Sequence, residues 1–181
     1  TMILMKQAGC RLLAVGFESA DQGCLNKMRK GISVKQMKAF VENAKKTGLL
    51  IHGCFMAGNP GETRVTLQKT LALAKDLNCD TMQFFPLIVY PGTEAYEWAK
   101  SSSFLSTEDY SRWANSNGEL CSIIDLPNLS KEEISLFCHQ ALKQYYIRPK
   151  YILMKLRQLI KYPSEIRRTL KSAKTFLRHM I

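Results

Sequence analysis

Apolar runs alternate with amphipathic segments along the first hundred residues of the chain. Three runs are almost continuously apolar, and each ends in a polar or turn-forming segment; they span residues 11–17, 49–57 and 81–89. The segments between them carry apolar residues at the three- and four-residue spacing of a helix with one buried face. Continuous apolar strands that alternate with helices are typical of parallel strands buried on both faces. The pattern therefore predicts an α/β fold, either a doubly wound sheet or a (β/α) barrel.

Capping residues indicate where the helices of this region begin and end. Ser33 and Gln36 have the S-x-x-Q spacing of a capping box, and Gly48 follows as a natural stop. Thr63 begins a second long helix directly after the Gly-Asn-Pro-Gly turn. The predicted helices of the first hundred residues span approximately 2–9, 23–28, 33–47, 63–77 and 94–100.

Beyond Lys100 the alternation stops. Residues 101–118 are polar and turn-rich, and we expect one helix to begin at Ser106. The box Ser130-x-x-Glu133 begins another helix, which runs to about Ile147, where Arg148-Pro149 interrupts it. Two further helices are expected over 150–161 and 164–179. We therefore predict two regions, a strand-and-helix region over 1–100 and an all-helical C-terminal region over 101–181.

The net charge of +11 is unevenly distributed. Residues 143–181, called the tail from here on, contain eleven Lys and Arg and one acid, which gives +10. Residues 1–142, called the body, contain the other fifteen bases and fourteen acids, which gives +1. A neutral body joined to a basic tail indicates that the two parts have different tasks.

The tail mixes its bases with apolar residues. On its first helix one broad face is shared by Ile152, Leu153, Leu156, Leu159 and Ile160. A basic amphipathic helix of this kind can lie on an anionic membrane surface, so residues 148–181 are a candidate for peripheral membrane contact. The alternative is that the apolar face packs on the body and the charges are solvated. Nucleic acid is not an expected partner, because the tail lacks a recognisable reading motif.

The six cysteines are scattered, and no two of them have CxxC spacing. We expect reduced thiols, several of them buried, and no metal site made by this chain. No apolar run approaches the length of a membrane span, and no signal-peptide pattern is present. We predict a cytoplasmic location, with the tail allowing a peripheral position on the inner membrane face.

Candidate chemistry lies at the carboxyl ends of the predicted strands, where sites in parallel sheets and barrels are found. Glu18 follows a buried strand directly and could accept hydrogen bonds from a ribose diol. Lys30 could return to the same rim and meet a carboxylate. The alternative interpretation of the following Pro-Gly turns is purely structural, with Thr63 and Thr93 capping helices.

The order and spacing of three segments carry a family resemblance, which extends over roughly residues 3–155. The segments are AGCRLLAVGFESADQGCLNKMRKGI, AKKTGLLIHGCFMAGNPGET and FFPLIVYPGTEAY. Together they resemble the second half of the barrel of radical S-adenosylmethionine (SAM) enzymes of the cobalamin-binding group. That group includes the anaerobic magnesium-protoporphyrin ester cyclase and hopanoid-modifying enzymes. The resemblance implies strands four to six of a partial (β/α)6 barrel, followed by a helical C-terminal extension.

The resemblance also implies a set of cofactor-binding residues. Glu18 matches the position that contacts the ribose hydroxyls of SAM, and Lys30 a position that binds the methionyl carboxylate. The segment from Cys54 to Met56 matches the strand whose backbone lies against the adenine, although Cys54 stands where some relatives carry a polar ribose ligand. The complete implied set is Gly16, Glu18, Ser19, Lys30, Cys54, Met56, Gly58, Pro60 and Gly61.

The implied cofactors are SAM, a [4Fe–4S] cluster and cobalamin. The cluster motif CxxxCxxC is absent from this chain. The chain begins at Thr1 inside a predicted helix, so we expect a fragment whose cluster ligands and cobalamin domain lie outside it, and which is inactive alone. The implied function is radical or methyl-transfer chemistry on a small-molecule or lipid substrate, such as an isoprenoid or a tetrapyrrole. The alternative is a non-catalytic basic module that binds an anionic membrane or a protein partner, which would need no cluster motif.

Overall fold

The computed structural model describes residues 1–116, 118, 120–163 and 166–180, with side chains up to residue 175. The chain forms two compact units, Thr1–Leu142 and Lys143–Ile181, and these coincide with the neutral body and the basic tail. The boundary that we predicted at residue 100 stays a prediction.

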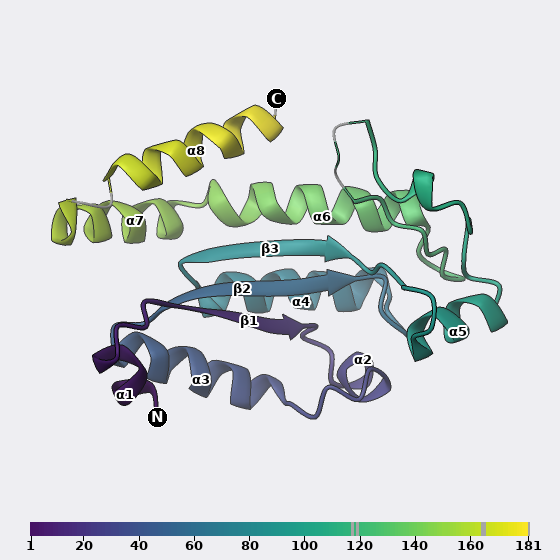
Figure 1. Cartoon of the computed structure of the whole chain (residues 1–181), viewed down its shortest axis with the longest axis horizontal. Coiled ribbons are helices and arrows are strands. Elements are labelled where there is room, and N and C mark those ends of the chain that lie inside the picture. Colours follow the sequence, from purple (N-terminus) through teal and green to yellow (C-terminus); the bar gives the residue numbers. More distant parts are fainter. Residues whose placement is uncertain (117, 119, 164–165, 181) are drawn as a thin grey trace. The chain divides into compact units, whose positions relative to one another are not determined.

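The body contains a parallel sheet of three strands in the order β1-β2-β3, as Figure 1 shows. The strands are β1 (Leu12–Glu18), β2 (Leu50–Ala57) and β3 (Thr81–Pro86). The three predicted strands are confirmed, but β3 ends three residues earlier than predicted. The reason is that β2 turns away at Gly58, whose φ is 96°, so the ladder ends with a hydrogen bond from the Leu87 N–H to the Ala57 carbonyl at 2.7 Å.

Helices connect these strands and begin at the residues that the sequence predicts. The helices of this part are α1 (Met2–Gln7), α2 (Gln22–Lys27), α3 (Val34–Lys46), α4 (Arg64–Leu77) and α5 (Glu94–Ser101). The Ser33 hydroxyl accepts a hydrogen bond from the Gln36 N–H at 3.3 Å, and the Gln36 side chain accepts one from the Ser33 N–H at 2.8 Å. This reciprocal pair is the predicted capping box.

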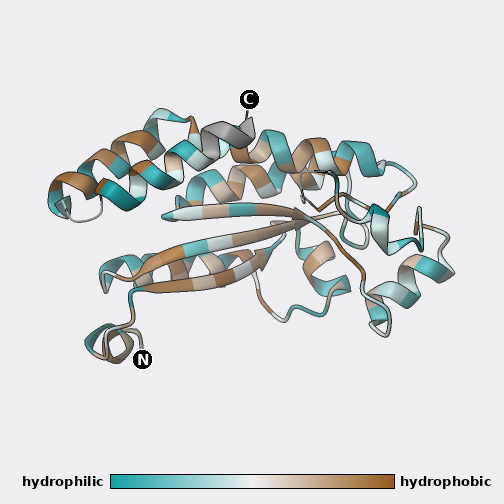
Figure 2. Cartoon of the chain, turned by 45° about the horizontal axis from the view of Figure 1, so that its top comes forward, coloured by the Kyte–Doolittle hydropathy of each residue, from teal (hydrophilic) through white to brown (hydrophobic). Residues whose placement is uncertain are grey.

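The core of the body lies on the side of the sheet that faces α3 and α4. Along β2 the side chains alternate, so Ile51 and Phe55 are fully buried whereas His52, Cys54 and Met56 are half-buried. Phe55 stacks between Phe17 of β1 and Phe84 of β3, with ring centroids 5.6 and 5.7 Å apart. Figure 2 shows the long hydrophobic stretches of the strands that build this core.

The segment between α5 and α6 (Lys131–Tyr146) differs from the prediction. The helix expected at Ser106 was wrong, and the described residues form only a 3-10 turn over Tyr110–Arg112. Local side chains take the backbone donors that a helix would use, because Thr107 accepts from the Asp109 N–H and Asp109 from the Ser111 N–H. The segment instead folds back on itself through an antiparallel bridge between Leu105 and Ile124.

The tail contains α7 (Pro149–Lys161) and α8 (Ile166–Met180). The predicted break at Arg148-Pro149 is confirmed, and Arg148 stacks over the Tyr145 ring at 4.3 Å. Residues 164–165, with which we expected the last helix to begin, lie outside the described residues. Three strands are described for this chain, so the fuller six-stranded barrel stays a prediction.

Candidate functional site

The carboxyl end of β1 presents a carboxylate on an unusual backbone. Pairing with β2 shifts register between Gly16 and Glu18, which leaves Phe17 as an extra residue. Glu18 then adopts a left-handed conformation with a φ of 67°. Its carboxylate forms an ion pair with the Lys30 ammonium at 2.9 Å, and the Glu18 side chain is 14% exposed. The structure therefore brings together the two charged residues that the sequence singled out.

Gly16 and Ser19 flank this carboxylate without contributing a functional group to the site. A side chain at Gly16 would collide with the Glu18 carboxylate, so the glycine provides the space that the ion pair occupies. Ser19 is completely buried, and its hydroxyl accepts a hydrogen bond from the Asp21 N–H at 3.1 Å. Both residues thus shape the turn after β1.

The turn after β2 is organised around a buried carboxylate. One oxygen of Glu62 accepts hydrogen bonds from the Gly58 N–H at 2.6 Å and the Asn59 N–H at 3.0 Å. The Asn59 amide in turn donates to the Met56 carbonyl at 2.9 Å. The Gly-Asn-Pro-Gly turn at the tip of β2 is therefore held from within by the acid that follows it.

Burial changes the proton affinity of this carboxylate. Glu62 is 3% exposed, and the loss of solvation raises its pKa to about 7, although the backbone donors of Asn59 and Gly58 act in the opposite direction. Its second oxygen, Oε1, is buried and has no hydrogen-bond partner, and the same is true of Asn59 Oδ1. The turn thus contains two buried acceptor atoms that a hydrogen-bond donor would stabilise. For the Glu62 oxygen, protonation of the carboxylate would have a similar effect.

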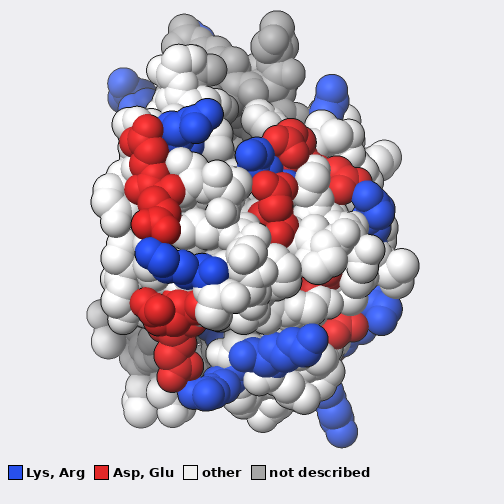
Figure 3. All heavy atoms as spheres, turned by 90° about the vertical axis from the view of Figure 1, so that its right-hand side faces the viewer, with Lys and Arg blue, Asp and Glu red and all other residues white. Residues whose placement is uncertain are grey.

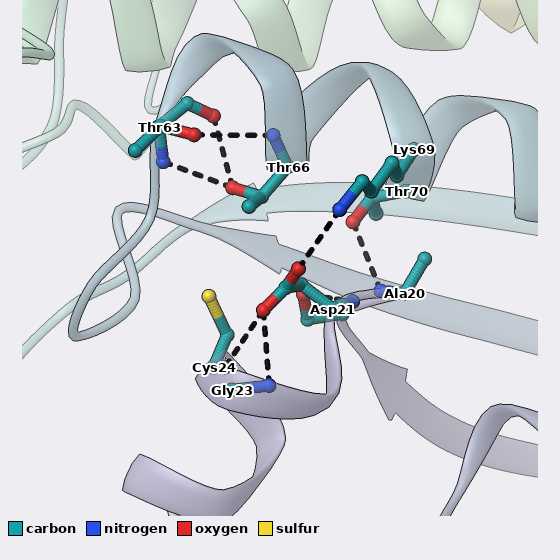
Figure 4. A network of polar contacts seen from close by, with 9 residues as sticks. Ala20, Asp21, Gly23, Cys24, Thr63, Thr66, Lys69 and Thr70 are labelled. Carbon is teal, nitrogen blue, oxygen red and sulfur yellow. Dashed lines mark hydrogen bonds and ion pairs between the residues drawn. The ribbon is translucent and has the colours of Figure 1, made fainter.

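The loop after β1 is tied to α4 by a second polar network, which Figure 4 shows. The Ala20 N–H donates to the Thr70 hydroxyl at 3.0 Å, and the Lys69 ammonium lies 3.3 Å from the Asp21 carboxylate. Asp21 also caps α2 by accepting from the N–H groups of Gly23 and Cys24. Burial acts to raise the pKa of Asp21, but the hydrogen bonds from Cys24 and Lys69 outweigh it and lower the pKa. The loop that follows Glu18 is consequently anchored to both α2 and α4.

The ends of β1 and β2 open onto a cavity of about 840 Å³. Acidic and basic side chains are interspersed on the end of the molecule toward which the strands point (Figure 3). The lining contains five residues of the predicted set, namely Glu18, Lys30, Met56, Pro60 and Gly61. A volume of this size is within the usual range for sites that bind cofactors and small molecules.

The other four residues of the predicted set are not among those that line the cavity. They are Gly16, Ser19, Cys54 and Gly58. Cys54 is half-buried on the same side of β2 as Met56, two residues before it, and burial together with the charge of Glu18 raises the pKa of its thiol. Gly58 begins the turn that carries Pro60 and Gly61, and its positive φ suits a residue without a side chain.

The structure adds residues that the sequence analysis did not select. Asn59 and Glu62 line the cavity from the turn, and Trp98, Phe104 and Leu126 form part of its apolar wall. Glu62 follows Gly58 by four residues, and this position next to the turn was the sequence signal that could have identified Asn59 and Glu62 as site residues. No periodic pattern marks Phe104 and Leu126, which come together because the Asp125 N–H donates to the Phe104 carbonyl at 2.8 Å.

Within the described part of the chain, no group of three or more His, Cys, Asp or Glu side chains is placed to hold a metal ion. The six cysteines are present as thiols, and three of them are buried. Burial, assisted by the charge of Glu62, raises the pKa of Cys24 to about 11 and that of Cys138 to about 12. The Cys24 and Cys138 thiols are therefore protonated at neutral pH, as is expected of thiols that are buried in apolar surroundings.

Comparison with known proteins finds relatives that include methyltransferases and a cyclase. The chain is 34% identical over 149 residues to an uncharacterized methyltransferase, PH0819, of Pyrococcus horikoshii, covering 82% of this chain and 32% of that protein. It is 27% identical over 94 residues to the anaerobic magnesium-protoporphyrin IX monomethyl ester cyclase of Rubrivivax gelatinosus, covering 52% of this chain and 17% of the cyclase. No family model matches the chain.

A solved structure has a similar fold. It is the radical S-adenosylmethionine methyltransferase TsrM from Kitasatospora setae with cobalamin and a [4Fe–4S] cluster bound, at a TM-score of 0.58 and 19% identity. The likeness covers 82% of this chain and 34% of TsrM. The chain is therefore similar in sequence to a methyltransferase and to a magnesium-protoporphyrin cyclase, and similar in fold to a radical SAM methyltransferase that binds cobalamin. The predicted resemblance is thereby confirmed, over a chain that spans about a third of the length of TsrM and of PH0819.

Proposed function

We propose that the body provides the SAM-binding half of a radical SAM enzyme of the methyl-transferring kind. The observation that carries this proposal is the Glu18 carboxylate, which faces the cavity at a strand end with Lys30 at 2.9 Å. Methyltransferases among the relatives and the bound cofactors of TsrM support it. We also propose the substrate class of the reaction and the location of the remaining cofactor-binding parts.

The residues around the cavity have the chemistry that SAM requires. A carboxylate can accept two hydrogen bonds from the vicinal hydroxyls of a ribose, and Glu18 would do so from the end of β1. Lys30 would bind the methionyl carboxylate, while Met56 and Leu87 offer apolar surface for the adenine. In this arrangement the ion pair between Glu18 and Lys30 would be replaced by hydrogen bonds from the ribose hydroxyls to Glu18 and by an ion pair between Lys30 and the methionyl carboxylate.

The remaining cofactors would be held by residues outside this chain. An iron–sulfur cluster supplies the electron for SAM cleavage, and cobalamin supplies a methyl group, when they are bound. The role of the body is then to orient SAM, through Glu18 and the turn from Gly58 to Glu62, and to keep water from it. The apolar wall of the cavity, with Trp98, Phe104 and Leu126, favours a substrate with a large hydrophobic body, such as a lipid, isoprenoid or tetrapyrrole.

Equilibrium binding of SAM to the full-length protein tests the central contact. We expect Glu18→Gln to weaken SAM binding by about tenfold or more, because hydrogen bonds to a charged group are worth about 1.5–3 kcal/mol. Glu42→Gln is the matched control, since Glu42 is an exposed acid on α3 that does not line the cavity. Equal affinities of the Glu18→Gln variant and the wild type would contradict the assignment of the ribose contact.

A further inference from the structure

The first helix of the tail presents an apolar stripe to solvent. Ile152, Leu156 and Ile160 recur at four-residue spacing on α7, and they are 46%, 53% and 80% exposed. Leu153, beside them, is 49% exposed. Residues spaced in this way share one face of a helix. The stripe is therefore continuous along α7.

A different side of α7 is covered by aromatic side chains. Tyr151 is 9% exposed, and its ring contacts those of Tyr145 and Tyr146, with centroids 5.4 and 5.0 Å away. Lys155 extends over the Tyr151 ring and donates to Gln158 at 2.9 Å. The aromatic cluster thus lies on the buried side of α7 and does not involve the exposed stripe.

Basic residues border the stripe and continue onto the next helix. Arg157 and Lys161 are exposed on α7, and Arg167, Arg168 and Lys171 are exposed on α8. Ile166 and Leu170, which also recur at four-residue spacing, are 42% and 62% exposed. With eleven bases and one acid, the tail has a net charge of +10. Figure 2 shows how hydrophobic and hydrophilic residues alternate along both helices.

We propose that this surface, made by α7 and α8, docks the protein on an anionic phospholipid membrane. Exposed aliphatic side chains bordered by Lys and Arg have the composition of helices that lie in the plane of a membrane interface. None of the described helices is long and apolar enough to cross a membrane, so the contact is with the surface. Nucleic acid would attract the same cations but would leave the aliphatic stripe unused.

Flotation of the full chain with lipid vesicles tests the proposal. Vesicles of phosphatidylcholine with phosphatidylglycerol are compared with vesicles of phosphatidylcholine alone, at low and physiological salt. We expect binding to the anionic vesicles only, weakened by salt. The double variant Arg157→Gln/Lys161→Gln should bind about 25-fold more weakly, since each base near the surface contributes about fivefold. The variant Leu156→Ser/Ile160→Ser should lose at least about tenfold, because the apolar insertion is removed.

Matched variants of the body separate this surface from general electrostatics. Lys35→Gln/Lys46→Gln removes two exposed bases of α3, and Val65→Ser removes a side chain of α4 that is 67% exposed. Both should bind vesicles as the wild type does. The proposal is overturned if neutral and anionic vesicles bind equally, if the body and tail variants lose binding equally, or if the wild type does not bind at low salt.

Two further outcomes identify a different role for the stripe. If Leu156→Ser/Ile160→Ser lowers the melting temperature by several degrees and leaves vesicle binding unchanged, the stripe is covered by the protein itself. If a single-stranded oligonucleotide binds as tightly as the vesicles and the apolar variant binds it normally, the tail is a polyanion-binding surface. Either result rejects the membrane assignment.

Discussion

The body and the tail use charge and apolar surface in opposite ways. In the body, bases are matched by acids, as in the pairs Lys30–Glu18, Lys38–Asp76 and Arg64–Glu133, and its large aromatic side chains are stacked in a core. In the tail, there are eleven bases and one acid, and four aliphatic side chains of α7 are 46–80% exposed. A neutral, packed unit suits a site that must hold small ligands in fixed positions. An unbalanced, partly uncovered unit suits contact with an extended surface of opposite charge.

The largest expected difference between the two units concerns packing. Phe55→Ala should lower the free energy of unfolding by about 3–5 kcal/mol, because Phe55 is fully buried between the rings of Phe17 and Phe84. Leu156→Ala in the tail should change it by less than about 0.5 kcal/mol, since Leu156 is exposed. Urea denaturation of both variants measures the contrast. A similar loss for both would mean that α7 buries this side chain in solution.

A second expected difference is a pH response that originates in the body. The folded protein raises the pKa of Glu62 from its usual 4.5 to about 7, so the folded state favours the protonated form. The stability that this gives is fully present below pH 4.5 and is lost as the pH rises through 7, a loss of about 3 kcal/mol relative to an unperturbed carboxyl. Glu62→Gln should remove this component, because the amide oxygen can still accept from Gly58 and the amide cannot ionise.

Chemical denaturation at pH 5, 6, 7 and 8 compares Glu62→Gln with the wild type. The difference in unfolding free energy between the two proteins should change between pH 5 and 7 in favour of the variant and should level off above pH 7. The exposed acid Glu42 supplies the control, and Glu42→Gln should follow the wild-type profile. Parallel profiles for the wild type and Glu62→Gln would show that the buried carboxylate is not the source of the pH response.

The smallest expected effect concerns surface charge. Arg29 and Glu94 form an ion pair at 3.1 Å in which both side chains are about four-fifths exposed, at 79% and 83%. A double-mutant cycle with Arg29→Gln and Glu94→Gln should give a coupling free energy of at most about 1 kcal/mol. Arg29→Gln should also leave vesicle binding within about twofold of the wild type, unlike the loss of Arg157 and Lys161. A large loss with Arg29→Gln would place the lipid-binding surface on the body.

The elements that could be predicted from the sequence are those with local signals. The three strands are continuous apolar runs, and Ser33, Thr63 and Ser130 mark helix starts by side-chain chemistry. Glu18 and Lys30 were both expected at the rim formed by the strand ends, because parallel strands end at one edge of the sheet. Their ion pair at 2.9 Å was not predicted, because each had been assigned to a different group of the ligand.

The elements that could not be predicted depend on contacts between distant residues. Phe104 and Leu126 reach the cavity through a non-periodic segment, whose bridge from Leu105 to Ile124 has no signature along the chain. The helix expected at Ser106 was wrong because a capping residue was present without a following apolar stripe. Cys54, placed in the site by resemblance, lies two residues before Met56 on the same side of β2, but only Met56 lines the cavity.

The left-handed backbone at Glu18 places two requirements on one residue. Glycine adopts a φ of 67° at little conformational cost, whereas a residue with a side chain is held there only by its surroundings. A replacement of Glu18 by glycine would therefore relax the turn while deleting the carboxylate. Selection for thermal stability alone, for example in directed evolution, would tend to erase this acid. Any engineering of this chain should fix position 18 before stability is optimised elsewhere.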